Sequence, residues 1–250
     1  MAFVQTAFVQ AAPVCFTDTK KKGSMKFMLS KKGIKSLCAG LLLAGLLSPA
    51  ARGEAGEDQA WMRFWIMQDI NKTVGVKVAH EDRFRDSDED KYYYGYTDIS
   101  VPVKLNDYLT LAPAVRQIHT LRGGVWRDDL MPHLTLSSKT PLGPVVLKNR
   151  MRLVRTDKDD SDVDPVQYRH RLDVVSAEGW TSWKLKPYVA DEVFYDFTDR
   201  DLNQNRAYVG LLFSPVHRLS FDLYVMREDT KKANEWNDIL VFGLITRFEF

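Results

Sequence analysis

The sequence predicts an all-β protein, an antiparallel up-and-down transmembrane β-barrel of ten to twelve strands. Three observations predict it: apolar and polar residues alternate with a period of two, a secretory signal precedes them, and the chain ends in an apolar strand. After residue 55 we find no sustained helical period and no apolar run near the roughly 20 residues that a membrane helix needs.

Composition narrows the class of protein. The 250 residues are 45% hydrophobic and 27% charged, with 35 Lys and Arg against 33 Asp and Glu. This balance suits one large folded domain and argues against a disordered chain or a nucleic-acid-binding protein. The two cysteines, Cys15 and Cys38, both precede residue 40.

The amino-terminal region has the pattern of an export signal. Residues 25–35 are basic, residues 37–47 are apolar, and small residues that suit a cleavage site follow. The apolar run is too short to span a bilayer, so we interpret residues 25–55 as a signal peptide. We interpret residues 1–24 as an extension from a mis-assigned start codon, and residues 56–250 as the barrel domain, which then folds without disulfides.

Alternating segments fill the barrel domain. In chain order, the expected strands are 61–70, 73–83, 92–105, 108–119, 129–139, 144–155, 166–177, 182–196, 205–214, 217–228 and 237–250. These are eleven segments, whereas bacterial single-chain barrels have an even number. Either segment 61–70 does not cross fully or one long segment is misread.

The connections between these segments alternate in length. Short turns rich in Asn, Asp, Gly and Pro are expected at 71–72, 106–107, 141–144, 178–180 and 214–216. Longer polar loops are expected at 86–90, 157–164, 198–205 and 228–234. Short turns at one end and longer loops at the other are typical of outer-membrane barrels.

The stretch VVLKNRMRLVR, residues 145–155, indicates which face meets which solvent. Lys148, Arg150 and Arg152 share one face, and the other carries Leu147, Asn149, Met151 and Leu153. A cation facing lipid at mid-membrane costs about 2–4 kcal/mol, so the basic face is expected to point inward. Alternation alone is equally compatible with a periplasmic β-sandwich. The signal peptide and the carboxyl-terminal strand favour the barrel.

That last strand, residues 240–250, alternates apolar residues and ends on Phe250. It has the pattern that the outer-membrane assembly machinery recognises, so we expect that machinery, outer-membrane lipid and lipopolysaccharide as partners. Tyr92–Tyr96, Trp126, Tyr195 and Trp236 near strand ends suit an aromatic girdle, although ordinary cross-strand packing would also explain them.

Several short motifs resemble those of one family. They are Trp61, Glu81–Phe84, Leu111–Arg116, Asn149–Leu153, Tyr168–Leu172, Lys186–Asp196 and Asn205–Leu211. Over residues 61–250 the chain resembles the bacterial outer-membrane proteins grouped as domain of unknown function 2490. The resemblance implies a barrel in the outer membrane and assigns no activity. A lesser similarity to small porins for acidic oligosaccharides carries over no binding residue.

The candidate site is the lumen. Its predicted residues are Lys77, Arg116, Lys148, Arg150, Arg152, Arg169, Arg171, Lys184, Lys186 and Glu192. Clustered basic groups in a narrow polar pore favour small anionic solutes by charge and bidentate hydrogen bonding. Alternatively, Glu81, Asp98, Asp173, Glu192 and Asp222 neutralise those bases and leave a non-conducting structural barrel.

An enzyme is the rival hypothesis from another class. His133, Thr135 and Ser137 share one strand face, as a barrel lipase or deacylase would require of a base and a hydroxyl nucleophile. Same-face residues lie about 6.5–7 Å apart along a strand, so we expect no enzyme and no catalytic residue. The acidic loop 157–164 lacks the Gly and the final Glu of an EF-hand, and we expect no metal or cofactor.

Overall fold

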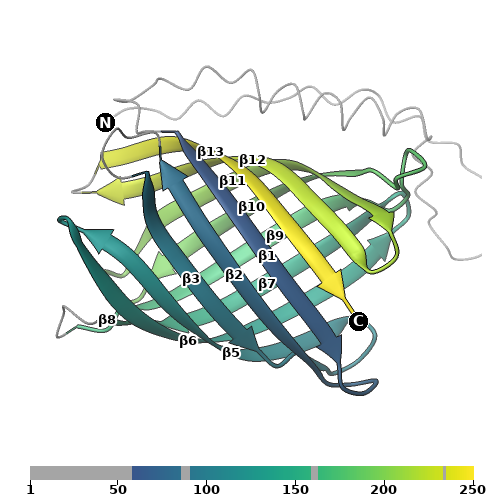
Figure 1. The fold of residues 1–250 in the computed structure, drawn as a ribbon, viewed down its shortest axis with the longest axis horizontal. Coiled ribbons are helices and arrows are strands. Elements are labelled where there is room, and N and C mark those ends of the chain that lie inside the picture. The colour runs from purple at the N-terminus through teal and green to yellow at the C-terminus, as the bar shows by residue number, and fades with distance from the viewer. Residues whose placement is uncertain (1–57, 86–90, 159–162, 233–234) are drawn as a thin grey trace, which may run out of the picture.

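The computed structural model describes residues 58–85, 91–158, 163–232 and 235–250, and the predicted signal and amino-terminal extension lie outside them. All regular secondary structure in the described residues is β-strand (Figure 1). The strands are β1 (Gln59–Asp69), β2 (Gly75–Arg85), β3 (Tyr92–Ser100), β4 (Val103–Lys104), β5 (Leu109–Arg122), β6 (Val125–Leu142), β7 (Val145–Arg155), β8 (Asp157–Lys158), β9 (Val166–Ser176), β10 (Lys186–Asp196), β11 (Asp201–Val216), β12 (Leu219–Lys232) and β13 (Glu235–Glu249).

Eleven long strands form one closed ring, and the two-residue strands β4 and β8 pair with its rim. Each long strand pairs with its neighbours in chain order, and β1 pairs with β13 to close the ring. The predicted all-β up-and-down barrel and its predicted ten to twelve strands are therefore confirmed. Segment 61–70, the least certain of the predicted strands, is the full strand β1.

The seam of the barrel corrects one part of the prediction. β1 runs parallel to β13, with Gln59 opposite Val241 and Met67 opposite Glu249, so the barrel is mixed rather than wholly antiparallel. The reason is the odd number: when successive strands reverse direction, the first and the eleventh run the same way. The start of β1 and the end of β13 therefore lie at opposite ends of the barrel, here called the amino rim and the carboxyl rim (Figure 1).

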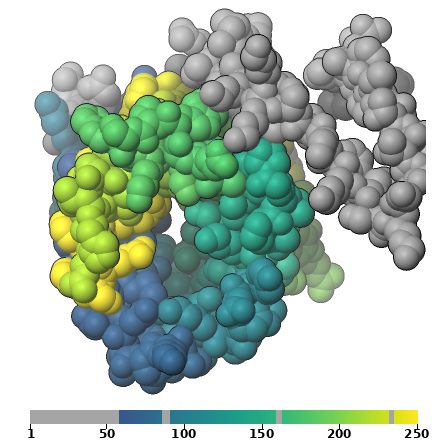
Figure 2. All heavy atoms as spheres, turned by 90° about the vertical axis from the view of Figure 1, so that its right-hand side faces the viewer, coloured from purple at the N-terminus to yellow at the C-terminus, as the bar shows by residue number. Residues whose placement is uncertain are grey.

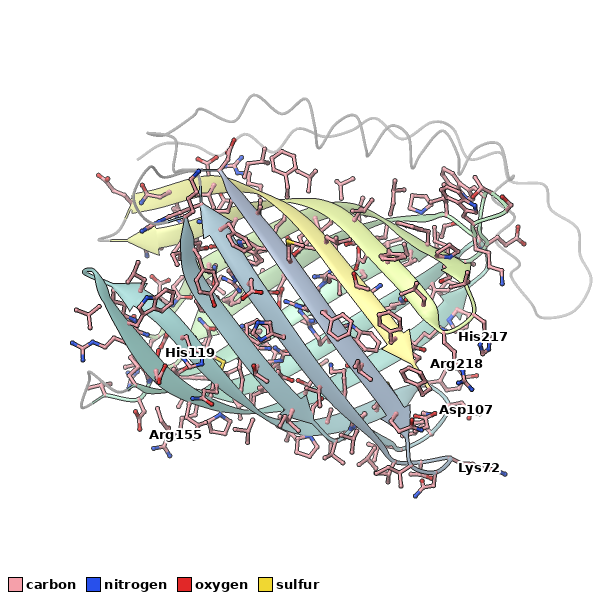
Figure 3. The ribbon with its side chains drawn as sticks, viewed as in Figure 1. Lys72, Asp107, His119, Arg155, His217 and Arg218 are labelled. Atoms are coloured by element: carbon pink, nitrogen blue, oxygen red, sulfur yellow. The ribbon has the colours of Figure 1, made fainter. Side chains whose placement is uncertain are left out.

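The expected alternation of short turns and long loops is wrong. Connections at the amino rim are 86–91, 123–124, 156–165, 197–200 and 233–234, and those at the carboxyl rim are 70–74, 101–108, 143–144, 177–185 and 217–218, so each rim mixes lengths. Figure 3 marks His119 and Arg155 toward one end and Lys72, Asp107 and Arg218 toward the other.

Two expected loops are paired strand instead. Residues 201–205 belong to β11 and residues 228–232 to β12. The backbone groups of polar residues form the same strand hydrogen bonds as those of apolar residues when a neighbouring strand is present. Residues 120–122 and 125–128 likewise extend β5 and β6, which meet at Gly123 and Gly124. Both glycines have positive φ (56° and 75°), the conformation of a two-residue hairpin turn that matches strand twist.

The wall of the ring is apolar on its outer surface. Large hydrophobic side chains are exposed on the outward positions of the long strands, among them Met62, Phe64, Ile66, Val78, Ile99, Val115, Leu130, Leu134, Met151, Leu153, Leu172, Leu211, Leu223 and Phe242. Figure 2 looks along the barrel from the carboxyl rim and shows this end hollowed at its centre. The predicted orientation is confirmed in β7, where Lys148, Arg150 and Arg152 line an interior cavity.

Polar residues on the outer surface contact one another. On β7 and β9, Asn149 Oδ1 lies 3.0 Å from His170 Nε2. On β10 and β11, the amide of Asn205 donates to Asp191 at 3.1 Å. Asn149 and His170, which interrupt the apolar alternation near the middle of β7 and β9, thus contact each other across adjacent strands.

Candidate functional site

Two adjacent cavities lie inside the ring, because their lining residues come from strands all around it. The larger has a volume of about 260 Å³ and reaches toward the carboxyl rim, where Lys148 and Arg247 line it. The smaller has about 40 Å³ and lies nearer the amino rim, where Arg83 and Arg206 line it. A water needs roughly 10–15 Å³, so the smaller cavity has room for a few waters, and the larger has room for a small ion.

Basic residues dominate both linings. The larger cavity is lined by eight basic residues, Arg63, Lys77, Arg116, Lys148, Arg150, Arg152, Arg171 and Arg247, and by three acidic ones, Asp98, Asp173 and Asp222. The smaller cavity is lined by Arg63, Arg83, Arg116, Arg150, Arg152, Arg169, Arg171 and Arg206, with Glu192 as its acidic residue. The alternation of each strand aims these side chains inward, and the ring brings them together.

Part of this charge is neutralised by carboxylates on neighbouring strands. Buried Glu81 accepts hydrogen bonds from Arg63 (2.7 Å) and Arg83 (2.8 Å). Buried Glu192 accepts from Arg150 at 2.8 Å and from the Tyr208 hydroxyl at 3.1 Å.

The other interior carboxylates are also engaged. The pairs are Asp98 with Arg116, Asp173 with Arg171, Asp222 with Arg247 and Glu228 with Arg206, at 2.5–3.0 Å. The acidic partners suggested by the sequence are thus in place, together with Glu228.

Four of the cations that line these cavities have no carboxylate partner among the described residues. Arg152 donates to the hydroxyl of Thr135 at 2.9 Å, and Arg169 donates to the side-chain oxygen of Gln167 at 2.8 Å. Lys77 lies 5.8 Å from the centre of the Trp65 ring, and Lys148 has no hydrogen bond or ion pair with described residues. A sheltered cation that no carboxylate contacts is costly, so this group, the unpaired cations, favours an anion beside it.

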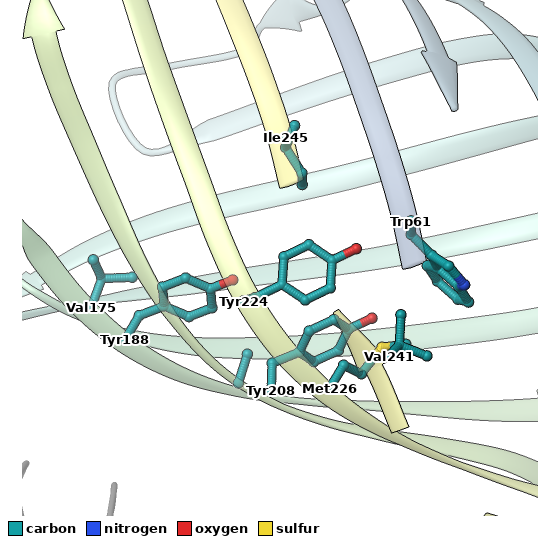
Figure 4. Close-up of a cluster of buried hydrophobic side chains, with 9 residues drawn as sticks. Trp61, Val175, Tyr188, Tyr208, Tyr224, Met226, Val241 and Ile245 are labelled. Atoms are coloured by element: carbon teal, nitrogen blue, oxygen red, sulfur yellow. The ribbon is translucent and has the colours of Figure 1, made fainter. Parts of the chain in front are cut away.

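The part of the interior wall that β10 to β13 and β1 form is aromatic (Figure 4). Tyr188, Gly210, Tyr224, Gly243 and Trp61 follow one another across five neighbouring strands in one row of pairings. Each tyrosine lies over the glycine of the next strand: a Cβ at Gly210 would come within 2.4 Å of the Tyr188 ring, and one at Gly243 within 1.9 Å of the Tyr224 ring. Only glycine leaves room for this close packing.

Arginines pack onto the same aromatic surface. The guanidinium of Arg83 lies 3.5 Å from the centre of the Trp61 ring, and that of Arg206 lies 4.9 Å from it. Such contacts between a cation and an aromatic face are stabilising, more so when they are shielded from water. Trp61 is therefore held in contact with two guanidinium groups, and each of them also has a carboxylate partner.

Most predicted site residues line the cavities: Lys77, Arg116, Lys148, Arg150, Arg152, Arg169, Arg171 and Glu192. Lys186 is half-buried at the start of β10 and lines neither cavity. The placement of Lys184 is a correction. β10 begins at Lys186 rather than 182, because the chain turns at Lys184 (φ 52°), whose exposed side chain lies in the carboxyl-rim connection.

Sequence reasoning missed four lining residues, Arg63, Arg83, Arg206 and Arg247. Arg63 alternates with Trp61 and Trp65 in the segment whose strand status was in doubt, and Arg247 sits within the apolar last strand. The period of two, applied strictly to every strand, would have placed all four inward.

Two of the three residues of the enzyme hypothesis, His133 and Thr135, form a buried contact. His133 Nε2 lies 2.8 Å from Asp98 Oδ2, and His133 Nδ1 lies 3.4 Å from the Thr135 hydroxyl. That hydroxyl already accepts a hydrogen bond from Arg152. His133 and Thr135 are each less than a tenth exposed, so Thr135 is engaged as part of the wall.

No group of three or more His, Cys, Asp or Glu within the described residues is arranged to hold a metal ion. The acidic loop 157–164 lies partly outside those residues. At its ends, Arg155 pairs with Asp157 (2.9 Å) and with Asp164 (2.7 Å). The hydrogen bond from Arg155 lowers the pKa of the Asp164 carboxyl.

None of the described residues forms a helix long and apolar enough to cross a membrane. Residues 58–238 match the family model described as protein of unknown function, DUF2490. This match confirms the family resemblance drawn from the short motifs. No curated protein matches the sequence.

Proposed function

The chain belongs to the DUF2490 family, and on that premise we propose that it is an outer-membrane β-barrel whose basic lumen binds and passes small anions. The apolar outer surface supports the location, since a water-soluble barrel would expose polar residues there. β1, β2, β7, β9 and β10 each have 11 residues, the length that a tilted strand needs to cross a bilayer.

One observation carries the functional proposal: Lys77, Lys148, Arg152 and Arg169 line the interior cavities, and no carboxylate among the described residues pairs with them. The charges that act most strongly on Arg152 are those of Arg150, Arg116 and Arg169, and each of them outweighs the attraction of Asp98. Guanidinium groups bind carboxylate and phosphate oxygens in a bidentate manner. The cavity volume limits the solute to a small ion.

Assembly of the barrel would depend on its last strand. β13 presents outward Phe242 and ends at Glu249, and the next residue, Phe250, is exposed at the carboxyl rim beside Arg218. This is the strand that the assembly machinery would bind, and lipid and lipopolysaccharide would then surround the barrel. No catalytic activity is part of the proposal.

Planar-bilayer recording of the purified protein tests the proposal. We expect discrete conductance steps and a reversal potential that reports anion preference in a KCl gradient. Replacing both unpaired arginines, Arg152→Gln with Arg169→Gln, should lower that preference about tenfold at low ionic strength, because a basic cleft concentrates counter-ions electrostatically. Lys72→Gln, which removes an exposed cation from a carboxyl-rim turn, is the matched control and should change it little.

The rival within the same fold is a non-conducting structural barrel. The observation that favours it is the smaller cavity, which at about 40 Å³ narrows the interior among eight arginines, six of which have carboxylate partners. Absence of conductance steps for the folded protein would establish this alternative. Cation preference would contradict the assigned role of the unpaired cations.

A further inference from the structure

A polar patch lies on the outer surface at half the height of the barrel wall. It consists of Asn149, His170, Asp191 and Asn205, on the neighbouring strands β7, β9, β10 and β11. These residues have the opposite parity to Arg150, Arg171, Glu192 and Arg206, which line the cavities, so they point outward.

The patch lies away from both rims, so it does not mark the level at which the apolar outer surface gives way to water. Asp191 is the middle residue of β10 (Lys186–Asp196), and His170 and Asn149 each stand one residue from the middle of their 11-residue strands. In a barrel that crosses the membrane with these strands, the patch lies near the bilayer centre. The inference therefore rests on the membrane location in the proposed function.

The patch is also incompletely satisfied. Asp191 is exposed, takes part in no ion pair with described residues, and accepts one side-chain hydrogen bond, from Asn205 at 3.1 Å. Ionisable groups within a membrane are rare and pair with one another or face protein. The outward residues at the middle of β12, β13 and β1 are instead Leu223, Phe242 and Phe64, which suit lipid.

A second group of polar residues on the outer surface shows the contrast. On β2 and β3, His80 Nδ1 lies 3.0 Å from the Thr97 hydroxyl and His80 Nε2 lies 3.2 Å from Asp82. This group contains its own acid and base. In the polar patch the base, His170, contacts Asn149, and the acid contacts Asn205, so acid and base remain available to a partner.

We propose that β9 and β10 form the interface of a homodimer in the membrane, in which His170 of each copy pairs with Asp191 of the other. Two copies inserted in the same direction are related by a two-fold axis along the membrane normal. Such an axis beside the boundary between β9 and β10 places β9 of one copy opposite β10 of the other at the same height. His170 and Asp191 stand on these two strands, so one contact generates its symmetric equivalent and removes both side chains from lipid.

The pairing register places an apolar reporter beside this contact. Leu172 on β9 is exposed and lies directly opposite Asp191 of β10 in the same sheet. It therefore faces the proposed axis, and a cysteine there would approach its counterpart in the second copy. Leu223 on β12 is similarly exposed and lies outside the patch.

Cysteine crosslinking in native outer membranes tests the interface. In a background with Cys15→Ser and Cys38→Ser, Leu172→Cys should give an oxidation-dependent species of twice the mass, and Leu223→Cys should not. Asp191→Leu should reduce the Leu172→Cys crosslink roughly tenfold or more, because it removes a desolvated charge pair while leaving a side chain that suits lipid. The exchanged variant, His170→Asp with Asp191→His, should restore the crosslink.

The outcomes separate this inference from the proposed function. Protein absent from the outer-membrane fraction would overturn the location and the dimer with it. Folded protein in that fraction without a Leu172→Cys dimer, or with the cysteine joined to a different protein, would overturn the homodimer alone. If Asp191→Leu left the crosslink unchanged, the dimer would not depend on the proposed ion pair.

Discussion

Two parts of the interior wall fill the narrow barrel in different ways. The aromatic wall, β10 to β13 with β1, places Tyr188 and Tyr224 over glycines, and its arginines, Arg63, Arg206 and Arg247, each have a carboxylate partner. The basic wall, β7 and β9, carries Lys148, Arg152 and Arg169, which have no such partners in the part of the chain that the structure describes. One wall is filled by aromatic packing and charge pairing, whereas the other carries cations that no described carboxylate neutralises by contact.

The largest effect should come from breaking the aromatic wall. Gly243→Val places side-chain atoms where the Tyr224 ring lies, 1.9 Å from the position of a Cβ. We expect a loss of about 3 kcal/mol in the free energy of unfolding, the upper part of the usual range for overpacking. Urea titration followed by the gel shift of the folded barrel measures it. Adding Tyr224→Ala should recover much of the loss, and failure to recover would show that the ring contact is not the cause.

A smaller effect should follow from converting a paired arginine of the basic wall into an unpaired one. Glu192→Gln removes the carboxylate that accepts a hydrogen bond from Arg150 and keeps the shape of the side chain. We expect a loss of about 2 kcal/mol, below the usual cost of breaking a buried pair because Arg150 is 29% exposed. The same titration measures it, and an unchanged midpoint would contradict a structural role for this pair.

Removing an unpaired cation should have the opposite sign. Arg152→Gln relieves repulsion from Arg150, Arg116 and Arg169 and should raise the free energy of unfolding by about 1 kcal/mol. Arg206→Gln is the matched control, since it breaks a pair with Glu228 and should destabilise the protein. If both substitutions destabilised equally, the distinction between the two walls would be wrong.

The smallest effect concerns bound anions. Inorganic phosphate should raise the thermal midpoint of the wild-type protein by a few degrees, because a ligand that binds only the folded state stabilises it by mass action. The effect should be lost in the protein carrying both Arg152→Gln and Arg169→Gln. Potassium chloride at equal ionic strength controls for screening, and an equal shift in both proteins would point to general salt effects.

Much of the lumen could be predicted from the sequence, because inward or outward direction is local. The alternation of VVLKNRMRLVR placed Lys148, Arg150 and Arg152 correctly without knowledge of any partner strand. Prediction failed where direction depends on a strand boundary. Lys184 was assigned to the wall because the segment was taken as strand from 182, whereas the chain turns there and β10 starts at Lys186.

The sequence by itself determined that the strands are two-faced, that cations belong on one face, and that eleven such segments exist. Only the tertiary structure decided how the eleven close, through the parallel pairing of β1 with β13, and which cations are neutralised. Arg150 and its partner Glu192 are 42 residues apart, and their contact depends on the register with which β9 pairs with β7 and β10. The alternation of side chains follows from the geometry of one strand, whereas closure and charge pairing depend on the stagger between strands, which no single segment encodes.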